Sequence, residues 1–314
     1  MARSTRPAVD RSIASAGAVT RDGQPISYSR APAPDLSPWI GRLYVTIVDA
    51  PADYRLACGL LNDTAMLRIQ LRGAWTAATA DGQQQMDRAA LFFGPNTRRM
   101  PIAVTGSFTS VGLSLRPGAC HALGAPSLDT LCDRMAPLEA IGLSSARWIS
   151  LFAEGASPED WCAAMESDVR RLIAERGAAE PDTVATCVEA AAFTNPETSV
   201  AALARQCGSE QRRLERLVRR DFGIPPKQVL RRARALDMAS HLRGVADKDE
   251  AEALALRYYD QSHLIREFTA LFGMSPRQFV EAPQPLMTLA LETHQSRRLE
   301  TIARIAPGGI KPWQ

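Results

Sequence analysis

The chain has 314 residues, of which 46% are hydrophobic and 23% are charged, and its formal net charge is +3. This length allows two domains with ordinary cores, and this composition excludes wholesale disorder. The longest uncharged stretch, 100–115, is too short and too rich in Gly, Ser and Thr to cross a bilayer, so we expect a soluble protein with no membrane partner.

The first thirty residues contain scattered Arg residues among Ser, Ala and Pro, without a continuous apolar run. A secretory signal peptide requires such a run. We therefore predict that residues 1–39 are a flexible extension and that the protein is cytoplasmic. The six Cys residues form no CxxC pair, and we expect them to be reduced and mostly buried.

From about residue 42 to residue 115, apolar residues tend to alternate with other residues. Two segments show this pattern, with Leu67, Ile69 and Leu71 in the first and Val111, Leu113 and Leu115 in the second. Such alternation is typical of half-buried strands. Glycines at positions 73, 82, 94 and 106 recur at turn-like intervals. The pattern predicts an antiparallel sheet or a small barrel.

Beyond Pro117 the apolar period becomes helical. One stripe contains Trp148, Ile149, Phe152, Trp161, Met165, Val169, Leu172 and Ile173. This stripe is either core or a dimer face. A polar segment at 175–182 then separates this half from an all-helical remainder. We predict a β-rich sensor or dimerisation domain with C-terminal helices at 40–178, a helical domain at 179–283 and a tail at 284–314.

The helical domain begins with predicted helices over 183–193 and within SVAALARQCG, followed by a glycine and a third helix. In this third helix Leu214, Leu217 and Val218 share one face, and Arg212, Arg216 and Arg219 share the opposite face. The apolar set is expected to pack against the rest of the domain, and the arginines are expected to project into solvent. A short helix, a glycine turn and an arginine-bearing helix are what a helix-turn-helix needs to enter the major groove of DNA.

Charge supports this interpretation. Residues 205–243 include eleven basic and four acidic residues, a net +7, so the remainder of the chain carries about −4. A basic region of this kind is typical of a surface that meets a polyanion, and the alternative is a solvated helix surface.

A second copy of the unit follows in DEAEALALRYYDQSHLIREFTALFGMSPRQF, with a turn at 257–259. Its second helix has Leu264 and Phe268 on the packing face. Both copies end alike, with Phe222-Gly223 and Pro226 matched by Phe272-Gly273 and Pro276. A helix over roughly 226–243 joins the copies, so two recognition helices can reach successive major-groove segments about 34 Å apart.

The runs YYDQSHLIREF and FGMSPRQF resemble the DNA-binding domain of the AraC/XylS family of bacterial transcription regulators, and the resemblance covers about 182–282. The first unit agrees at Ala204, Gly208, Leu214, Arg216, Phe222, Gly223 and Pro226. The stretch 91–139 further resembles the N-terminal sensor-like domain of one branch of these regulators. The predicted fold class is α+β, with an N-terminal β-rich barrel-like domain and its following helices, then a C-terminal all-α domain in which a helix joins two helix-turn-helix units.

We predict ten DNA-binding residues on the two recognition helices: Gln211, Arg212, Arg213, Glu215, Arg216, Arg219, Gln261, Ser262, His263 and Arg266. The chain departs from the family at Glu210, where a Ser or Thr cap is usual and Ser209 is an alternative cap, and at Arg257, where the turn usually has glycine. Val218 replaces a commonly aromatic core residue. Asp260 is expected to cap the second recognition helix.

Other interpretations of single residues stay open. The alternative role of His263 is metal ligand or general base, but the four His residues are far apart, so we predict no metal site and no cofactor. Arg98, Arg99 and Arg116 are either an anionic effector site or exposed strand ends. Cys120 beside His121 invites a catalytic dyad, but neighbours on a helix point apart.

The predicted function is a sequence-specific DNA-binding transcription regulator that is no enzyme. The partners are double-stranded operator or promoter DNA, a small-molecule effector or a homodimer formed through the N-terminal domain, and RNA polymerase if the regulator is an activator. The sequence does not identify effector-binding residues. The alternative is an enzyme with a barrel-type catalytic N-terminal domain fused to a DNA-binding tail, and we find no ligand cluster or carboxylate pair for it in the β-rich half.

Overall fold

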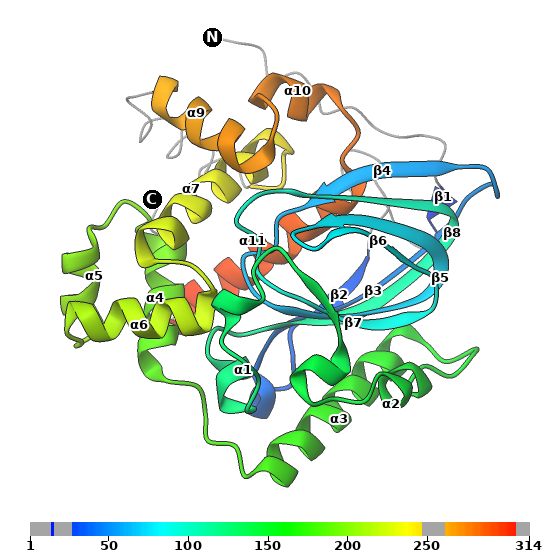
Figure 1. Cartoon of the computed structure of the whole chain (residues 1–314), viewed down its shortest axis with the longest axis horizontal. Coiled ribbons are helices and arrows are strands. Elements are labelled where there is room, and N and C mark those ends of the chain that lie inside the picture. The colour runs from blue at the N-terminus through cyan, green and yellow to red at the C-terminus, as the bar shows by residue number, and fades with distance from the viewer. Residues whose placement is uncertain (1–13, 16–26, 247–260, 306–314) are drawn as a thin grey trace.

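The computed structural model of the protein describes residues 14–15, 27–246 and 261–305 (Figure 1). An antiparallel sheet forms the first part of the chain, and helices form the second. The strands are β1 (Ala14–Ser15), β2 (Tyr28–Arg30), β3 (Ile40–Asp49), β4 (Arg55–Leu60), β5 (Met66–Thr79), β6 (Gly82–Met86), β7 (Ala89–Phe93), β8 (Met100–Leu115) and β9 (Met135–Pro137). The predicted β-rich region is confirmed.

The helices follow mostly after the sheet. Short 3₁₀ helices occur at Pro34–Leu36, Leu128–Thr130 and Leu138–Ile141. The α-helices are α1 (Ala119–Ala122), α2 (Ser145–Ser150), α3 (Pro158–Arg176), α4 (Thr183–Thr194), α5 (Val200–Gln206), α6 (Gln211–Phe222), α7 (Pro226–Leu242), α9 (Gln261–Phe272), α10 (Pro276–Glu281) and α11 (Pro285–Ile305). Among the described residues, no helix combines the length and apolar character that a membrane crossing requires.

The strands pair in the order β1-β3-β8-β5-β7-β9, while β2 pairs with β3, β4 with β8 and β6 with β5. All pairs are antiparallel, and the sheet is curved but not closed. Strand β8 pairs with β4 over its first six residues and with β3 over its last eight. The long β5 lies beside β8 along almost its whole length.

Two glycines predicted to mark turns instead lie inside these long strands. Gly106 has a φ of 69° at the point where β8 changes partner from β4 to β3. Gly73 has a φ of 104° opposite that point, where the register of β5 shifts against β8. Positive φ is the region that glycine adopts without steric cost. The two glycines therefore bend the sheet, and their prediction as turns between strands is wrong.

Helices cover both faces of the curved sheet. On one face Leu67, Ile69 and Phe92 pack against α2 and α3. The intervening side chains, such as Phe93, point to the other face, which α7, α9, α10 and α11 cover. The apolar stripe of α2 and α3 belongs to the first of these cores, so the alternative of a dimer face for this stripe is not needed.

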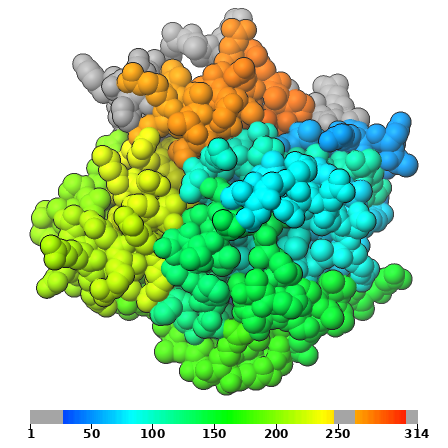
Figure 2. All heavy atoms as spheres, in the orientation of Figure 1, coloured from blue at the N-terminus to red at the C-terminus, as the bar shows by residue number. Residues whose placement is uncertain are grey.

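Helices α4 to α7 share a third core that includes Val188, Leu203, Leu214 and Leu230. Figure 2 shows these helices, in yellow-green and yellow, pressed against the sheet domain along a continuous boundary. Within this core the structure joins Cys187 of α4 to Cys207 at the end of α5 in a disulfide. The prediction of six reduced thiols is therefore wrong for this pair, because a separation of 20 residues in sequence hid two neighbouring positions on packed helices.

The segment after residue 284 forms α11, whose 21 residues lie between the sheet and the helical core (Figure 1). Its apolar side chains Leu286, Met287, Leu289 and Leu291 are buried against the second face of the sheet. The helix contacts β3 and β4 as well as α4 and α7. It therefore connects the sheet with the helices of the predicted DNA-binding domain.

Replacement of Gly223 by alanine should destabilise the protein more than replacement of Gly273. Both glycines end a recognition helix at positive φ, 76° and 69°. A Cβ at Gly273 meets nothing within 4 Å, whereas at Gly223 it would lie 2.4 Å from Cys132 Sγ. We expect about 1–2 kcal/mol for Gly273→Ala from backbone strain, and about 1–3 kcal/mol more for Gly223→Ala from the clash. Urea unfolding of the full chain measures both, and equal losses would contradict the close contact between α6 and the sheet domain.

Candidate DNA-binding surface and interior pocket

Helix α6 has the buried and exposed faces that the sequence predicts. Leu214, Leu217 and Val218 are buried in the helical core, with exposed fractions of 0%, 7% and 1%. The helix begins after Glu210 without a side-chain cap. The Ser209 hydroxyl lies 3.3 Å from the Glu210 carbonyl oxygen, so the alternative cap by Ser209 is not formed. Helix α6 is thus held by packing rather than by its N-terminal cap.

The opposite face of α6 exposes Arg212, Arg216 and Arg219. None of the three forms an ion pair with any residue in the described part of the chain. Arginines at a spacing of three to four residues lie in a row along one side of a helix. The structure therefore presents three free guanidinium groups to solvent from one helix face.

The other predicted residues of α6 have partners on the same surface. The Gln211 amide donates a hydrogen bond to the Glu215 carboxylate at 2.9 Å, one helical turn away. Arg213 pairs with Asp182 at the start of α4, at 3.3 Å. These exposed contacts are weak enough to open when a polyanion approaches.

In the stretch 205–243, fewer basic side chains are exposed and unpaired than the sequence suggests. Arg232 and Arg243 are buried, and Arg231 and Arg234 pair with Glu267 of α9 at 2.9 and 3.1 Å. The exposed members that pair with no described carboxylate are Arg205, Arg212, Arg216, Arg219 and Lys227. The surface available to a polyanion is therefore narrower than the count of eleven basic residues implies.

In the second unit, α9 packs through Leu264 and Phe268, as the sequence predicts, and Arg266 is exposed. Its buried Glu267 fixes it to α7. The backbone N–H of Arg99 in the sheet domain donates to the Leu271 carbonyl at 2.6 Å. Helix α9 is therefore attached both to the joining helix and to the sheet. The side chains of Gln261, Ser262 and His263 lie outside the described residues, as do 257–260 with the predicted cap Asp260.

The structure separates the residues of the sheet domain that were considered for an effector site, a catalytic dyad or a metal site. Arg116 is buried and pairs with Glu189 at 2.7 Å, while Arg98 is exposed, so these arginines form no joint effector site. Cys120 is buried and His121 is exposed, so the two side chains do not form a dyad. Burial raises the pKa of the Cys120 thiol to about 12. Within the described ranges, no group of three or more His, Cys, Asp or Glu side chains is arranged to hold a metal ion.

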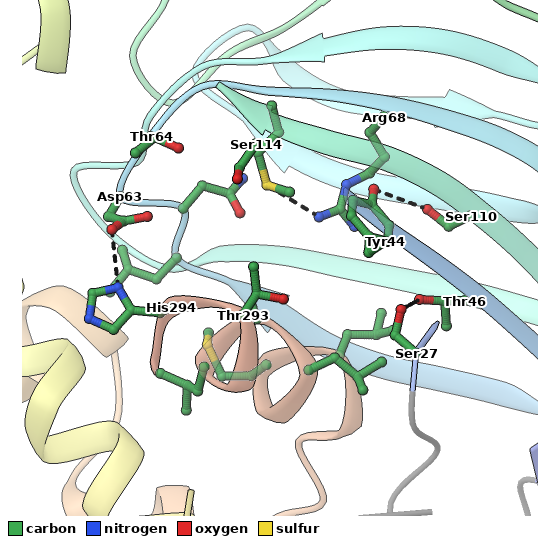
Figure 3. Close-up of a pocket in the computed structure, with 18 of the residues that line it drawn as sticks. Ser27, Tyr44, Thr46, Asp63, Thr64, Arg68, Ser110, Ser114, Thr293 and His294 are labelled. Carbon is green, nitrogen blue, oxygen red and sulfur yellow. Dashed lines mark hydrogen bonds and ion pairs between the residues drawn. The ribbon is translucent and has the colours of Figure 1, made fainter. Parts of the chain in front are cut away.

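A pocket that the sequence did not indicate lies between the second face of the sheet and α11 (Figure 3). Its cavity volume is about 60 Å³. The apolar part of its lining consists of Leu61, Met66, Trp75, Phe108, Leu236, Leu286, Met287, Leu289, Ala290 and Leu291. The polar part consists of Ser27, Tyr44, Thr46, Asn62, Asp63, Thr64, Arg68, Ser110, Ser114, Thr293, His294 and Arg297. A mainly apolar wall with a few polar groups is typical of a small-molecule site.

One end of the pocket is formed by a buried ionic network. Arg297 of α11 donates to Asp63, in the loop between β4 and β5, at 2.9 Å and to Glu189 of α4 at 2.7 Å. Arg116, at the end of β8, also donates to Glu189. Burial alone would raise the pKa of the Asp63 carboxyl, but the attraction of Arg297 and the hydrogen bond from His294 hold that pKa well below its usual range.

His294 of α11 lies between two carboxylates of this network. Its Nδ1 is 3.1 Å from Asp63, toward which it points in Figure 3, and its Nε2 is 3.9 Å from Asp237 of α7. Burial opposes protonation of the ring, but the two carboxylates outweigh it and raise the pKa of His294 to about 9. The imidazole is therefore a cation at neutral pH. Two elements of the helical domain, α4 and α7, thus meet the sheet domain through the charges of α11.

A family model described as a helix-turn-helix domain matches residues 203–282. The match covers both predicted units and confirms that this part of the chain is a helix-turn-helix domain. A search of curated protein sequences gave no match.

Several solved structures match this chain at low identity and with TM-scores below 0.5. ToxT from Vibrio cholerae is 8% identical with a TM-score of 0.46 over 76% of this chain and 97% of that one. Wild-type ToxT from Vibrio cholerae with bound unsaturated fatty acid is 9% identical with a TM-score of 0.43 over 76% and 94%. The AraC-like transcriptional activator CuxR is 12% identical with a TM-score of 0.27 over 69% and 88%. Identity at this level carries no information about ligand or operator.

The protonated His294 should make stability depend on pH. Its pKa is about 9 in the folded protein, against an ordinary value of 6.5. The contribution of the protonated imidazole to the free energy of unfolding is therefore complete below pH 6.5. It is lost as pH rises through 9, and the loss is at most about 3 kcal/mol. Urea unfolding at pH values from 6 to 10 should show this fall in the wild type and a smaller fall in His294→Gln. Parallel curves for the two proteins would show that His294 is not held between the two carboxylates.

Proposed function

We propose that this DNA-binding transcription regulator, whose helix-turn-helix domain is of the AraC type, contacts its operator through α6 and α9. We further propose that it takes a small-molecule effector in the pocket between the sheet and α11. The observation that carries the first proposal is the row of free arginines on α6. The proposal for the pocket rests on its position between the two parts of the chain.

On α6, Arg212, Arg216 and Arg219 have the chemistry for base readout. An exposed guanidinium can donate two parallel hydrogen bonds to the O6 and N7 atoms of guanine in the major groove. It can also neutralise a phosphate. The hydrophobic side of α6 is fixed in the helical core, so the row of arginines approaches DNA on a rigid support. We assign base readout mainly to α6.

Helix α9 has the complementary role of holding the DNA backbone. Its exposed described face carries a single cation, Arg266, next to Ile265, which is 44% exposed, and Thr269. A lone cation suits a phosphate contact, which fixes register and adds affinity without reading sequence. The ion pairs of Glu267 with α7 keep this helix at a fixed position relative to α6.

The pocket can influence DNA binding because α11 forms part of its wall. Asp63, His294 and Arg297 line the pocket and also belong to the ionic network that reaches α4 and α7. A ligand that binds one position of α11 better than another changes the population of those positions. Such a shift would move α4 and α7, and with them α6 and α9, relative to the sheet.

Alanine substitution of Arg212 or Arg216 should weaken operator binding by about 1–3 kcal/mol each if the residue contacts a base. The fold should remain, because both side chains are exposed and unpaired among the described residues. The operator is first obtained by selecting bound genomic fragments, and gel-shift titration then gives the affinities. Arg88→Ala, an exposed arginine in the turn between β6 and β7, removes the same charge and should leave affinity nearly unchanged.

Unchanged operator affinity in both α6 variants, with the helix content intact, would contradict the placement of α6 in the groove. An equal loss in Arg88→Ala would mean that only the net charge of the protein matters.

Arg266→Ala should weaken binding to operator and to random DNA by a similar factor. A residue that contacts only phosphate contributes equally to all sequences, and its removal lowers the salt dependence of binding by about one counterion. Binding is measured on both DNAs at several salt concentrations. A loss confined to the operator, with an unchanged salt slope, would show that Arg266 reads a base and that α9 contributes specificity.

A further inference from the structure

We propose that the pocket takes a short-chain monocarboxylate whose anionic end binds Arg68 and whose apolar end lies against α11. This inference rests on the proposed function, in which the pocket holds an effector, and it adds the chemical class of that effector. Three observations support it. They are the burial of Arg68 without an ion-pair partner among the described residues, the charge of the other lining residues, and the size and composition of the apolar wall.

Arg68 is a buried cation near the start of β5. Its exposed fraction is 6%, and it lies on the opposite face of the strand from Leu67 and Ile69. It forms no ion pair with any residue in 14–15, 27–246 or 261–305, and its Nε has no hydrogen-bond partner there. Its guanidinium contacts groups that carry no formal charge. Met66 Sδ lies at 3.7 Å, and the ring centroids of Tyr44 and Phe93 are 5.3 and 5.1 Å from Cζ.

A buried charge without a counter-charge is costly, so folded proteins normally pair it. Other buried cations at this junction have strong acceptors: Arg297 binds Asp63 and Glu189, Arg116 binds Glu189, and Arg232 donates to the backbone carbonyls of Asp63 and Asn96. Arg68 differs from them and also lines the pocket, beside Tyr44 in Figure 3. A carboxylate in the pocket would supply the missing charge through a short, charge-assisted hydrogen bond.

The rest of the lining favours an anion over a cation. Asp63 is the single acidic residue among the described lining residues, and Arg297 and His294 already occupy its two oxygens. A cationic ligand would therefore find no free carboxylate in this lining and would face the guanidinium of Arg68. A neutral ligand would leave that guanidinium without a counter-charge.

The apolar wall limits the body of the ligand. Leu286, Met287 and Leu289 come from the first two turns of α11, and Trp75 and Phe108 face them from the sheet. Because one water needs roughly 10–15 Å³ of such space, the cavity of about 60 Å³ fits about four to six non-hydrogen atoms. Acetate, propionate and butyrate have this size. A longer acid would extend beyond this cavity.

The test is a thermal unfolding series on the full chain with sodium acetate, propionate and butyrate at equal ionic strength. We expect each acid to raise the melting temperature by mass action. The amides of the same shape, acetamide, propionamide and butyramide, should not raise it, and neither should sodium chloride. This comparison uses the wild type and does not depend on a variant that folds.

Arg68→Met keeps the length of the side chain and removes its charge. We expect its melting temperature without acid to equal or exceed that of the wild type, because an unpaired buried cation has gone, and the response to the acids to be lost. Arg72→Met is the matched control, since Arg72 lies on the same strand, is exposed and pairs with Asp49. It should keep the response to the acids.

Three results would overturn the proposal: no shift with any of the three acids, equal shifts with the amides, or a full response in Arg68→Met. Gel-shift titration of the wild type on its operator, run with the same samples, separates this failure from failure of the proposed function. Intact operator binding without an acid response rejects the carboxylate and leaves the regulator. Absence of sequence-specific DNA binding rejects the proposed function itself.

Discussion

The buried guanidinium of Arg297 joins the two parts of the molecule. It binds Asp63 of the sheet domain and Glu189 of α4 at once. Among the described residues, the other ion-pair partner of Asp63 is His294, and the other partner of Glu189 is Arg116. Removing one partner of a buried pair typically costs about 3–5 kcal/mol, because the other charge stays buried. The position of α11 on the sheet is therefore strongly constrained, and the second core of the sheet depends on that position.

The same constraint extends to the DNA-binding helices. Arg232 of α7 donates to the backbone carbonyls of Asp63 and Asn96, and Arg99 holds the end of α9 at Leu271. At the end of α6, Gly223 approaches Cys132 so closely that no side chain fits between them. Both recognition helices are thus placed by contacts with the sheet domain, not only by the helix that joins them. The relative position of α6 and α9 therefore depends on the sheet and on the elements packed against it.

The wall of the pocket and the ionic network share Asp63, His294 and Arg297. The apolar turns at the start of α11 and the charged turns that follow have different roles. The first form the apolar wall of the pocket, and the second contact α7 and α4 through His294 and Arg297. Packed interfaces of this kind change between discrete arrangements rather than bending gradually.

The sequence by itself determined the features that depend on local periodicity. It predicted the buried and exposed faces of α6 and α9, the repeated Phe-Gly and Pro positions, and strands through Leu67 and Val111, because helix and strand geometry repeats over a few residues.

Interactions between distant segments were not predictable in this way. Cys187 and Cys207 meet across two packed helices, and Gly73 lies opposite the part of β8 that contains Gly106. Arg68 shows the limit most clearly: in an alternating strand it looks like a residue that faces water. Only the tertiary structure, by laying α11 over that face of the sheet, made it a buried cation in a pocket. Burial depends on which segment covers a face, and the pattern within a strand contains no information about a helix more than 200 residues later.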